Sequence, residues 1–193
     1  MAKPLQTVHH HSTAEFEIKK SRFIGALFPC TTQQHAVEQL NRLAHEHSNA
    51  NHLAFALRIR QPDGFINERS HDAGEPSGTA GRPILAPLEG ENLINVVVGV
   101  IRYFGGVKLG TGGLTRAYGN AAKMAIEQAV FQPWVEMTEF KMEIEYSELQ
   151  SLEYQLKKCH GEIIDQQFSD KVTVTIFLPL VDQQPLMQQF KPY

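Results

Sequence analysis

Apolar and polar positions alternate along residues 14–130 in a way that predicts strands and helices in turn. A hairpin is expected where residues 14–18 alternate, residues 19–22 form a basic turn and residues 23–28 are apolar again. A helix is expected after Thr31 or Thr32, either of which can cap it. Its apolar face would consist of Ala36, Val37, Leu40, Leu43 and Ala44. Two further strands are predicted at residues 52–59 and 65–68, joined by a turn at Pro62, Asp63 and Gly64.

The most distinctive stretch begins with an apolar, β-branched run at residues 96–104. Only Gly99 and Arg102 interrupt this run, which is typical of a central strand covered on both faces. Five glycines follow within nine residues, at positions 105, 106, 110, 112 and 113. This density predicts a loop whose backbone takes positive φ or approaches another group closely. A helix follows, with Leu114, Tyr118, Ala121, Ala125 and Ala129 at helical spacing.

The glycine loop matches neither of two known phosphate-binding motifs. From Gly110 the order Gly-Thr-Gly-Gly-Leu-Thr lacks the last glycine of the dinucleotide fingerprint. Gly105 and Gly110 have the spacing of a P-loop, but Thr111 stands where a lysine is needed. No nucleotide cofactor is therefore expected, although a loop before a helix can still hold an anion with its main-chain N–H groups.

A second polar segment, SHDAGEPSGTAGRP, spans residues 70–83. It contains acid-base side chains, small hydroxyls, glycines and prolines, and almost no apolar surface, so it cannot belong to the core. It is either a long polar connection or a binding loop. Pro83 suits the first turn of a short helix through about Leu88, which would direct Arg82 back at the loop. Pro87 is expected to end that helix early.

Two domains are predicted, at residues 14–130 and 136–193, with a linker at residues 131–135 where the helical pattern breaks. Residues 1–13 are polar and carry three consecutive histidines, so they are predicted to be a flexible tail. A metal-binding tract is the alternative interpretation of these histidines.

The C-terminal domain is predicted to have the element order β-α-β-β-α. Its helices are expected after a cap at Ser147, with Gly161 ending the first helix, and from Pro185. This order is one strand short of a ferredoxin-like βαββαβ unit. Either the chain is trimmed of a last strand at Tyr193, or the sheet has an exposed edge that something else must cover.

Composition is that of an ordinary soluble globular protein. The 193 residues are 42% hydrophobic and 20% charged, enough for one large or two small domains. No apolar stretch suits a membrane span or a secretion signal, so a cytoplasmic location is expected. The two cysteines, Cys30 and Cys159, lie in different predicted domains, which fits a reducing compartment. No set of side chains has the spacing of metal ligands, so no metal site is expected.

Three motifs, in the same order along the chain, resemble the IMPACT family, and most closely its two-domain bacterial branch, the YigZ proteins. They are Lys19-Lys20-Ser21-Arg22-Phe23, the run from Asp72 to Pro83, and Arg102-Tyr103-Phe104-Gly105-Gly106 with the run from Leu109 to Leu114. The resemblance implies an α+β protein whose N-terminal two-layer α/β domain is similar to the second domain of a small-subunit ribosomal protein and to domain IV of elongation factor G. It also implies a smaller ferredoxin-like C-terminal domain, here apparently without its last strand.

The resemblance further implies a role in translation. Eukaryotic IMPACT relatives act on translational control by binding the activator of a kinase that responds to amino-acid starvation. For the bacterial branch, a ribosome, a translation factor or RNA is the implied partner.

Charge differs between the two predicted domains. Residues 1–135 hold 13 Lys and Arg against 11 Asp and Glu, whereas residues 136–193 hold 5 against 10. A surface that binds nucleic acid must neutralise phosphates, so any RNA contact is expected on the N-terminal domain. The candidates are Lys19, Lys20 and Arg22 on the hairpin and Arg102, Lys108 and Arg116 around the glycine loop, with Tyr103 and Phe104 beside them.

Two functions remain open at this point. In the first, the two loops form a rigid patch that docks on a protein or ribosomal RNA partner without chemistry. Its binding residues would be Asp72, Glu75, Thr79, Arg82, Arg102, Tyr103, Gly105, Gly106, Lys108 and Gly112. In the second, an enzyme closes the same loops over a small phosphorylated ligand held by Arg82, Arg102 or Lys108, and His71, Asp72 or Glu75 transfers protons.

The binding module is favoured because no nucleophile-base pair is found and no catalytic residue can be assigned. Arg102 in an apolar strand is costly unless its charge is paired or bound. A buried salt bridge from Arg102 to Asp72 or Glu75 would account for it without an enzyme. The oligomeric state stays open.

Overall fold

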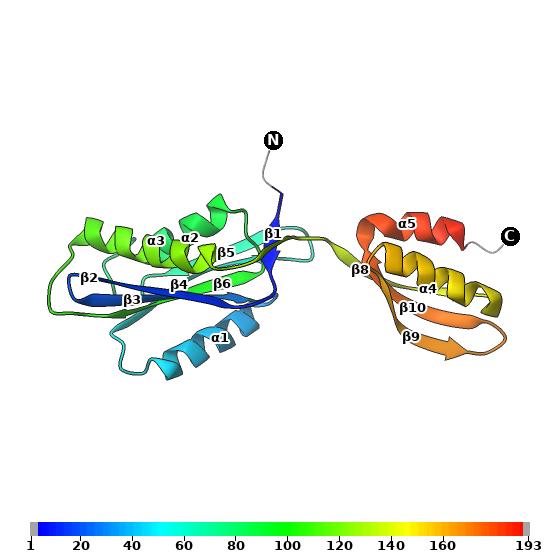
Figure 1. Cartoon of the computed structure of the whole chain (residues 1–193), viewed down its shortest axis with the longest axis horizontal. Coiled ribbons are helices and arrows are strands. Elements are labelled where there is room, and N and C mark those ends of the chain that lie inside the picture. The colour runs from blue at the N-terminus through cyan, green and yellow to red at the C-terminus, as the bar shows by residue number, and fades with distance from the viewer. Residues whose placement is uncertain (1–3, 191–193) are drawn as a thin grey trace. The chain divides into compact units, whose positions relative to one another are not determined.

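The computed structural model describes residues 4–190. The chain divides into two compact units, Met1–Trp134 and Val135–Tyr193. Each unit contains both helices and strands, which confirms the predicted α+β class (Figure 1). Within the described range, no helix is long and apolar enough to cross a membrane.

A five-stranded antiparallel sheet forms the centre of the N-terminal unit. Its order is β2-β3-β6-β4-β5. The strands are β2 (Ser12–Ile18), β3 (Ser21–Pro29), β4 (His52–Arg60), β5 (Ile66–His71) and β6 (Val96–Tyr103). All of β6 up to Arg102 is buried, which confirms the prediction that this apolar run is a central strand.

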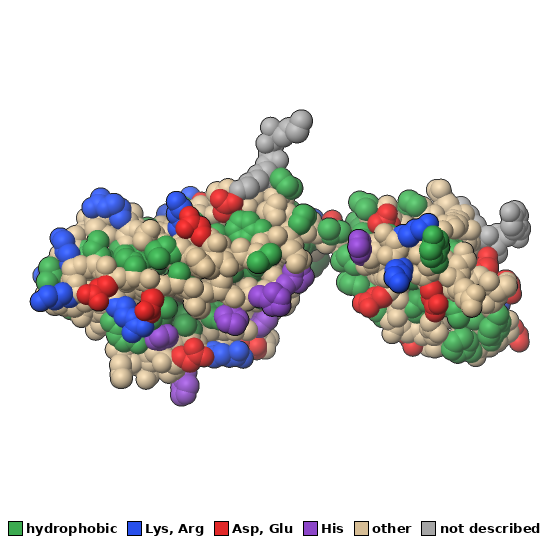
Figure 2. Space-filling model, viewed as in Figure 1, with side chains coloured by type: hydrophobic (Ala, Val, Ile, Leu, Met, Phe, Trp, Pro, Cys, Tyr) green, Lys and Arg blue, Asp and Glu red, His purple; other side chains and the backbone are tan. Residues whose placement is uncertain are grey.

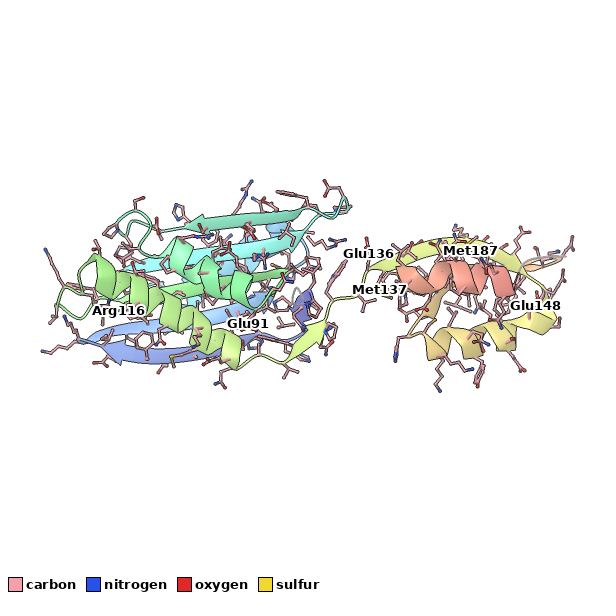
Figure 3. All side chains as sticks on the ribbon, turned by 90° about the horizontal axis from the view of Figure 1, so that it is seen from above. Glu91, Arg116, Glu136, Met137, Glu148 and Met187 are labelled. Carbon is pink, nitrogen blue, oxygen red and sulfur yellow. The ribbon has the colours of Figure 1, made fainter. Side chains whose placement is uncertain are left out.

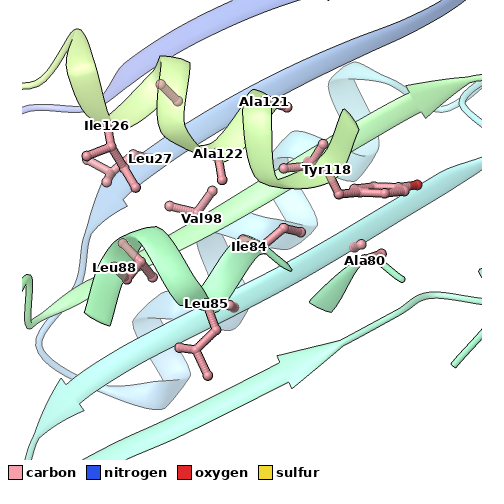
Figure 4. Packing of buried hydrophobic residues seen from close by; sticks show 14 of the residues in the cluster. Leu27, Ala80, Ile84, Leu85, Leu88, Val98, Tyr118, Ala121, Ala122 and Ile126 are labelled. Carbon is pink, nitrogen blue, oxygen red and sulfur yellow. The ribbon is translucent and has the colours of Figure 1, made fainter. Parts of the chain in front are cut away.

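Helices cover both faces of this sheet. They are α1 (Gln33–Glu46), α2 (Gly81–Gly90) and α3 (Thr111–Glu127). The two predicted layers are the sheet and the pair of helices α2 and α3. The buried side chains of these helices meet those of the sheet (Figure 4). Helix α1 lies on the opposite face of the sheet (Figure 1). Thr32 caps α1 as predicted, because its Oγ1 accepts the His35 N–H at 3.1 Å.

The predicted flexible tail and linker are both partly wrong. Strand β1 (Gln6–Val8) pairs antiparallel with β7 (Phe131–Pro133), so segments from the two regions form one small sheet. The next strand begins at Ser12, whose Oγ donates to the Ala125 carbonyl at 2.7 Å. This backbone pairing joins residues from the two ends of the unit's sequence. It gives a regular structure to a segment whose polar composition alone predicted a tail. Residues 1–3 of that predicted tail lie outside the described part of the chain.

The C-terminal unit has the predicted order β-α-β-β-α. Its elements are β8 (Met137–Ile144), a 3-10 turn (Tyr146–Glu148), α4 (Leu149–Lys158), β9 (Glu162–Phe168), β10 (Val172–Pro179) and α5 (Leu180–Gln189). The sheet order β8-β10-β9 is that of a βαββαβ unit without the fourth strand. Among the described residues β8 and β9 each pair only with β10, so both are edge strands. The fourth strand of a βαββαβ unit would lie beside β8.

Three local predictions are wrong. The second helix of the C-terminal unit does not begin at Pro185, because α5 begins at Leu180 and contains Pro185 in its interior. Pro87 does not end α2, which continues to Gly90 because its buried side chains hold it against the sheet. Ser147 does not cap α4. Instead, Glu145 and Glu148 form a reciprocal capping box around the 3-10 turn that leads into this helix.

Candidate functional site

A buried ionic network joins the polar loop at residues 70–83 to β6 and α3. Arg102 Nη1 donates to Glu75 Oε1 at 2.6 Å, and the two side chains are 7% and 4% exposed. Tyr118 OH donates to the same oxygen at 2.7 Å. Burial, together with the neighbouring Glu75 carboxylate, raises the pKa of Tyr118, so the phenol keeps the proton that it donates. Glu75 is therefore the carboxylate that balances the arginine in the apolar strand.

The guanidinium of Arg102 retains donors that the network does not use. Its Nε is buried and has no hydrogen-bond partner among the described residues. Its Cζ lies 5.6 Å from the ring centroid of Phe23 and 5.4 Å from that of Phe104. An arginine has five N–H donors, so this side chain can stabilise Glu75 and still interact with a ligand.

Asp72 organises the loop that precedes α2. Its Oδ2 accepts the Gly78 N–H at 2.8 Å, and its Oδ1 accepts the N–H groups of Ala80 at 2.9 Å and Gly81 at 2.7 Å. Ala80, the N-cap residue of α2, has no capping side chain of its own, so Asp72 caps this helix from outside. Partial burial by itself would raise the pKa of Asp72, but the three backbone donors outweigh it and lower that pKa.

His52, the first residue of β4, holds the turn that presents Glu75. Its Nδ1 lies 2.9 Å from the Ala73 carbonyl oxygen, and because a carbonyl only accepts, Nδ1 carries the proton. Its Nε2 lies 3.8 Å from Glu75 Oε1. Ala73 and Gly74 both have positive φ, 52° and 83°, as a tight turn at this point requires. The turn and the histidine together direct Glu75 toward β6.

A cleft of about 450 Å³ opens beside this network. It is lined by Asn51, His52, Glu75, Pro76, Arg102, Phe104, Lys108, Leu109, Gly110, Thr111 and Leu114. Its volume lies in the range of small-ligand sites, roughly 300–1,000 Å³. Gly110 is the N-cap residue of α3 and offers no side-chain cap, so the first N–H groups of this helix are available to an anion. Gly112 lies in the same first turn.

The β2–β3 turn packs against the glycine loop. A Cβ added to Gly105 would lie 1.9 Å from the Lys20 carbonyl oxygen, so only glycine permits this approach. The Gly105 N–H donates to Ser21 Oγ at 3.2 Å, and Gly106, with φ 85°, completes the bend. The exposed Lys19 and Lys20 are thereby held beside the loop that leads to α3.

Cationic side chains gather at this end of the N-terminal unit. Figure 2 shows Lys and Arg at the left end, where Figure 1 places the β2–β3 turn and the start of α3. Arg116, labelled on α3 in Figure 3, has its Nη1 3.7 Å from where a Gly112 Cβ would lie. Arg22 differs because its Nε donates to Glu15 at 3.2 Å, which compensates its charge. The structure thus groups most of the predicted nucleic-acid contacts around one end.

Tyr103 is a predicted site residue that the structure does not bring to the cleft. Its hydroxyl lies 2.9 Å from His47 Nδ1, at the C-terminal end of α1. Successive side chains of a strand point to opposite faces, so Tyr103 cannot share the side of its neighbour Arg102.

Arg82 and Thr79 do not line the cleft either. Arg82 Nη1 pairs with Glu89 at 2.9 Å along α2 and does not turn back to the loop. Thr79 is buried, and its hydroxyl donates to the Pro76 carbonyl at 2.6 Å, so it shapes the loop from within.

Comparison with known protein families identifies the chain. Residues 19–126 match the family model of the Impact N-terminal domain, and residues 142–191 match a domain of unknown function, DUF1949. The chain belongs to the IMPACT family. The resemblance seen in the three sequence motifs is confirmed.

Several relatives in the IMPACT family match most of the chain. IMPACT family member YigZ of Escherichia coli (strain K12) is 37% identical over 163 residues, which are 84% of this chain and 80% of YigZ. IMPACT family member YvyE of Bacillus subtilis (strain 168) is 34% identical over 166 residues, 86% of this chain and 76% of YvyE. A crystal structure of a hypothetical protein superposes with a TM-score of 0.72 at 33% identity, covering 98% of this chain and 92% of that one.

The second and third IMPACT-like motifs meet at the cleft although they are far apart in the sequence, and the first packs against the glycine loop of the third. The first supplies the basic turn, the second supplies Asp72 and Glu75, and the third supplies Arg102 and the start of α3. Asn51, His52 and Tyr118 complete the site but were not predicted as site residues. Only Tyr118 carried a usable signal, because a buried tyrosine hydroxyl needs a hydrogen-bond partner.

The capping role of Asp72 predicts a pH dependence. A carboxyl whose folded pKa is lowered adds stability above its unfolded pKa, about 3.9, and loses it as the pH falls through the folded value. We therefore expect the N-terminal unit of Asp72→Asn to unfold at a lower temperature than that of wild type at pH 7. This difference in unfolding temperature should become smaller as the pH falls below about 4. Thermal unfolding from pH 7 to pH 3 measures both effects.

The matched control is Asp170→Asn, which removes an exposed carboxyl from the β9–β10 turn. It should leave the unfolding temperature nearly unchanged at every pH. A difference between Asp72→Asn and wild type that is the same at pH 3 and pH 7 would contradict the capping role.

Proposed function

We propose that the N-terminal unit is a non-enzymatic docking module that binds the phosphate backbone of an RNA partner in the translation machinery. The two polar loops form the centre of the contact surface. The observation that supports this most is that the basic hairpin turn, the glycine loop and the open start of α3 lie together at one end. Each supplies positive charge, which attracts phosphates, or free N–H groups, which donate hydrogen bonds to phosphate oxygens.

The balance of charge at this end favours an anionic partner. Arg102 and Arg22 are compensated by Glu75 and Glu15. Four other cations form no ion pair with any residue from 4 to 190, namely Lys19, Lys20, Lys108 and Arg116. Unpaired cations that neutralise phosphates release counterions, which makes binding strong at low salt and steeply dependent on salt.

Two of the three acid-base candidates of the enzyme alternative serve the structure instead. Asp72 accepts three backbone N–H groups, and Glu75 is held by Arg102 and Tyr118. A general base must be free to accept a proton from a substrate. These contacts favour recognition over proton transfer, and the family resemblance to translation regulators makes ribosomal RNA the partner to test.

Removing the two lysines of the hairpin turn should weaken RNA binding. We expect Lys19→Ala/Lys20→Ala to bind a ribosomal RNA fragment roughly tenfold more weakly at low salt, because up to two phosphate contacts are lost. The slope of log affinity against log salt should become shallower by about 0.7–0.9 for each lost contact. Fluorescence anisotropy with a labelled fragment between 50 and 200 mM salt, a range of about fourfold, measures both quantities.

The matched control removes two lysines from the C-terminal unit, Lys157→Ala/Lys158→Ala, at the end of α4. It has the same change in charge and should bind RNA like wild type. Co-sedimentation of wild type and the two double variants with ribosomal subunits tests whether their binding to the intact partner differs in the same way. The proposal is wrong if wild type binds neither RNA nor subunits at low salt, or if the two double variants behave alike.

A further inference from the structure

The cleft has a more specific chemistry than the basic surface around it. We propose that it holds one unstacked nucleotide, with the base stacked on Phe104 and the phosphate at the start of α3 beside Lys108. The inference rests on the proposed function in so far as the nucleotide belongs to a single-stranded RNA. A free mononucleotide has the same chemistry, and the experiment below separates the two sources.

Phe104 supplies the stacking platform. This residue is 45% exposed although it lines the cleft, and the Arg102 guanidinium lies 5.4 Å from its ring centroid. The Phe104 N–H donates to Asn51 Oδ1 at 2.7 Å, which fixes the residue on its loop. Exposed aromatic rings with a neighbouring arginine are what proteins use to stack unpaired bases of single-stranded nucleic acids.

The start of α3 supplies the phosphate site. This helix has 17 residues and begins without a side-chain cap, so its first N–H groups and its dipole both favour an anion. A Cβ at Gly110 would meet no atom within 4 Å, so the approach to these N–H groups is open. Lys108 lines the same cleft and is exposed.

Arg102 gives an independent indication that a ligand belongs here. Its side chain is more than nine-tenths buried and lines the cleft, yet Nε has no partner among residues 4–190. A buried donor without an acceptor is costly, and a ligand in the cleft brings acceptors close to this guanidinium. Glu75 leaves part of the guanidinium charge available to such a ligand.

The shape and lining of the cleft fit a nucleotide better than a small phosphorylated metabolite. Pro76, Leu109 and Leu114 provide apolar walls that a flat aromatic base can cover. The Asn51 amide and the Glu75 carboxylate offer a donor and an acceptor to the edge of a base. A sugar phosphate would use the helix start and the lysine but would leave Phe104 and the apolar walls in water.

The test compares Phe104→Leu, which keeps apolar volume but loses the aromatic face, with Phe104→Trp, which keeps an aromatic face. The full chain is titrated against a labelled eight-nucleotide single strand, the same strand with abasic residues, and a duplex of equal length. Wild type should bind the intact strand roughly tenfold more tightly than the abasic strand, since stacking contributes most of this preference. Phe104→Leu should lose that preference, and Phe104→Trp should retain it.

Both variants should unfold at nearly the wild-type temperature because Phe104 is half exposed. Lys19→Ala/Lys20→Ala serves as the second comparison, since it should weaken binding to all three RNAs by a similar factor. Equal binding of wild type to intact and abasic strands overturns the nucleotide site. The docking function is then supported only by the weaker RNA binding of Lys19→Ala/Lys20→Ala.

A mononucleotide arm separates the two sources of the ligand. AMP and UMP at millimolar concentration are tested for a rise in the unfolding temperature of wild type and Phe104→Leu. A rise that Phe104→Leu abolishes, without any RNA binding, supports the nucleotide site with a free metabolite and overturns the docking function. No rise and no RNA binding overturn both.

Discussion

Arg102→Met is expected to destabilise the N-terminal unit by roughly 3–5 kcal/mol, because it leaves the buried Glu75 carboxylate without its counter-charge. Tyr118 would remain as the hydrogen-bond donor to Glu75 Oε1, which does not replace a positive charge. Trp134 is the single tryptophan of the chain and its ring lies 4.4 Å from the Arg60 guanidinium, so its fluorescence reports on this unit. Urea denaturation followed by this fluorescence gives the free energy of unfolding.

Two comparisons make this prediction specific. The double variant Arg102→Met/Glu75→Gln removes both charges and should recover much of the lost stability, since breaking a buried pair costs more than removing it. Arg82→Met removes an exposed pair, with side chains 62% and 32% exposed, and should cost at most about 1 kcal/mol. If Arg102→Met costs no more than Arg82→Met, the Arg102–Glu75 pair does not hold the polar loop against β6.

Gly105→Ala is expected to have the second large effect, a loss of about 3 kcal/mol, at the upper end of the usual cost of overpacking. The added Cβ would lie 1.9 Å from the carbonyl oxygen and 2.0 Å from the carbonyl carbon of Lys20. Backbone atoms cannot rotate away as the end of a flexible side chain can, so the hairpin turn must separate from the glycine loop. The same denaturation experiment measures the loss, and RNA anisotropy should show weaker binding as Lys19 and Lys20 move.

Gly112→Ala is the matched control because it introduces the same methyl group into the same glycine-rich segment. Its Cβ would meet only Arg116 Nη1, at 3.7 Å, within ordinary contact distance. Gly112 lies in α3, where alanine is favoured over glycine by up to about 1 kcal/mol, so stability should be unchanged or slightly higher. Equal midpoints of urea denaturation for Gly105→Ala and Gly112→Ala would contradict the close approach of the β2–β3 turn to the glycine loop.

Much of the fold could be predicted because it is encoded in neighbouring residues. The two-residue period of β2, the 3.6-residue period of α1 and the apolar runs of β3 and β6 are visible within single short windows of sequence. The cap at Thr32 is likewise local, since it depends on a residue three positions away. The pairing of β1 with β7 was missed because the two strands lie at opposite ends of the unit's sequence.

The candidate site was predicted in part. The two loops were identified from their glycines and polar residues, and Glu75 was one of two carboxylates expected to balance Arg102. Tyr103 was grouped with Arg102 although the strand period already directs the two side chains to opposite faces. Arg82 was expected to face the loop, but its choice of Glu89 depends on the helical geometry of α2.

The sequence by itself determined the α+β class, the IMPACT membership and the two polar loops, because periodicity and motifs are properties of consecutive residues. Only the tertiary structure decided that Glu75 rather than Asp72 meets Arg102, and that His52 and Tyr118 join them. These residues come from β4, the loop before α2, β6 and α3, and no short-range pattern specifies how separate elements align. Strand register and the packing of α3 on the sheet bring Arg102 and Tyr118 within hydrogen-bonding distance of Glu75. The same arrangement places His52 beside Glu75 at the cleft.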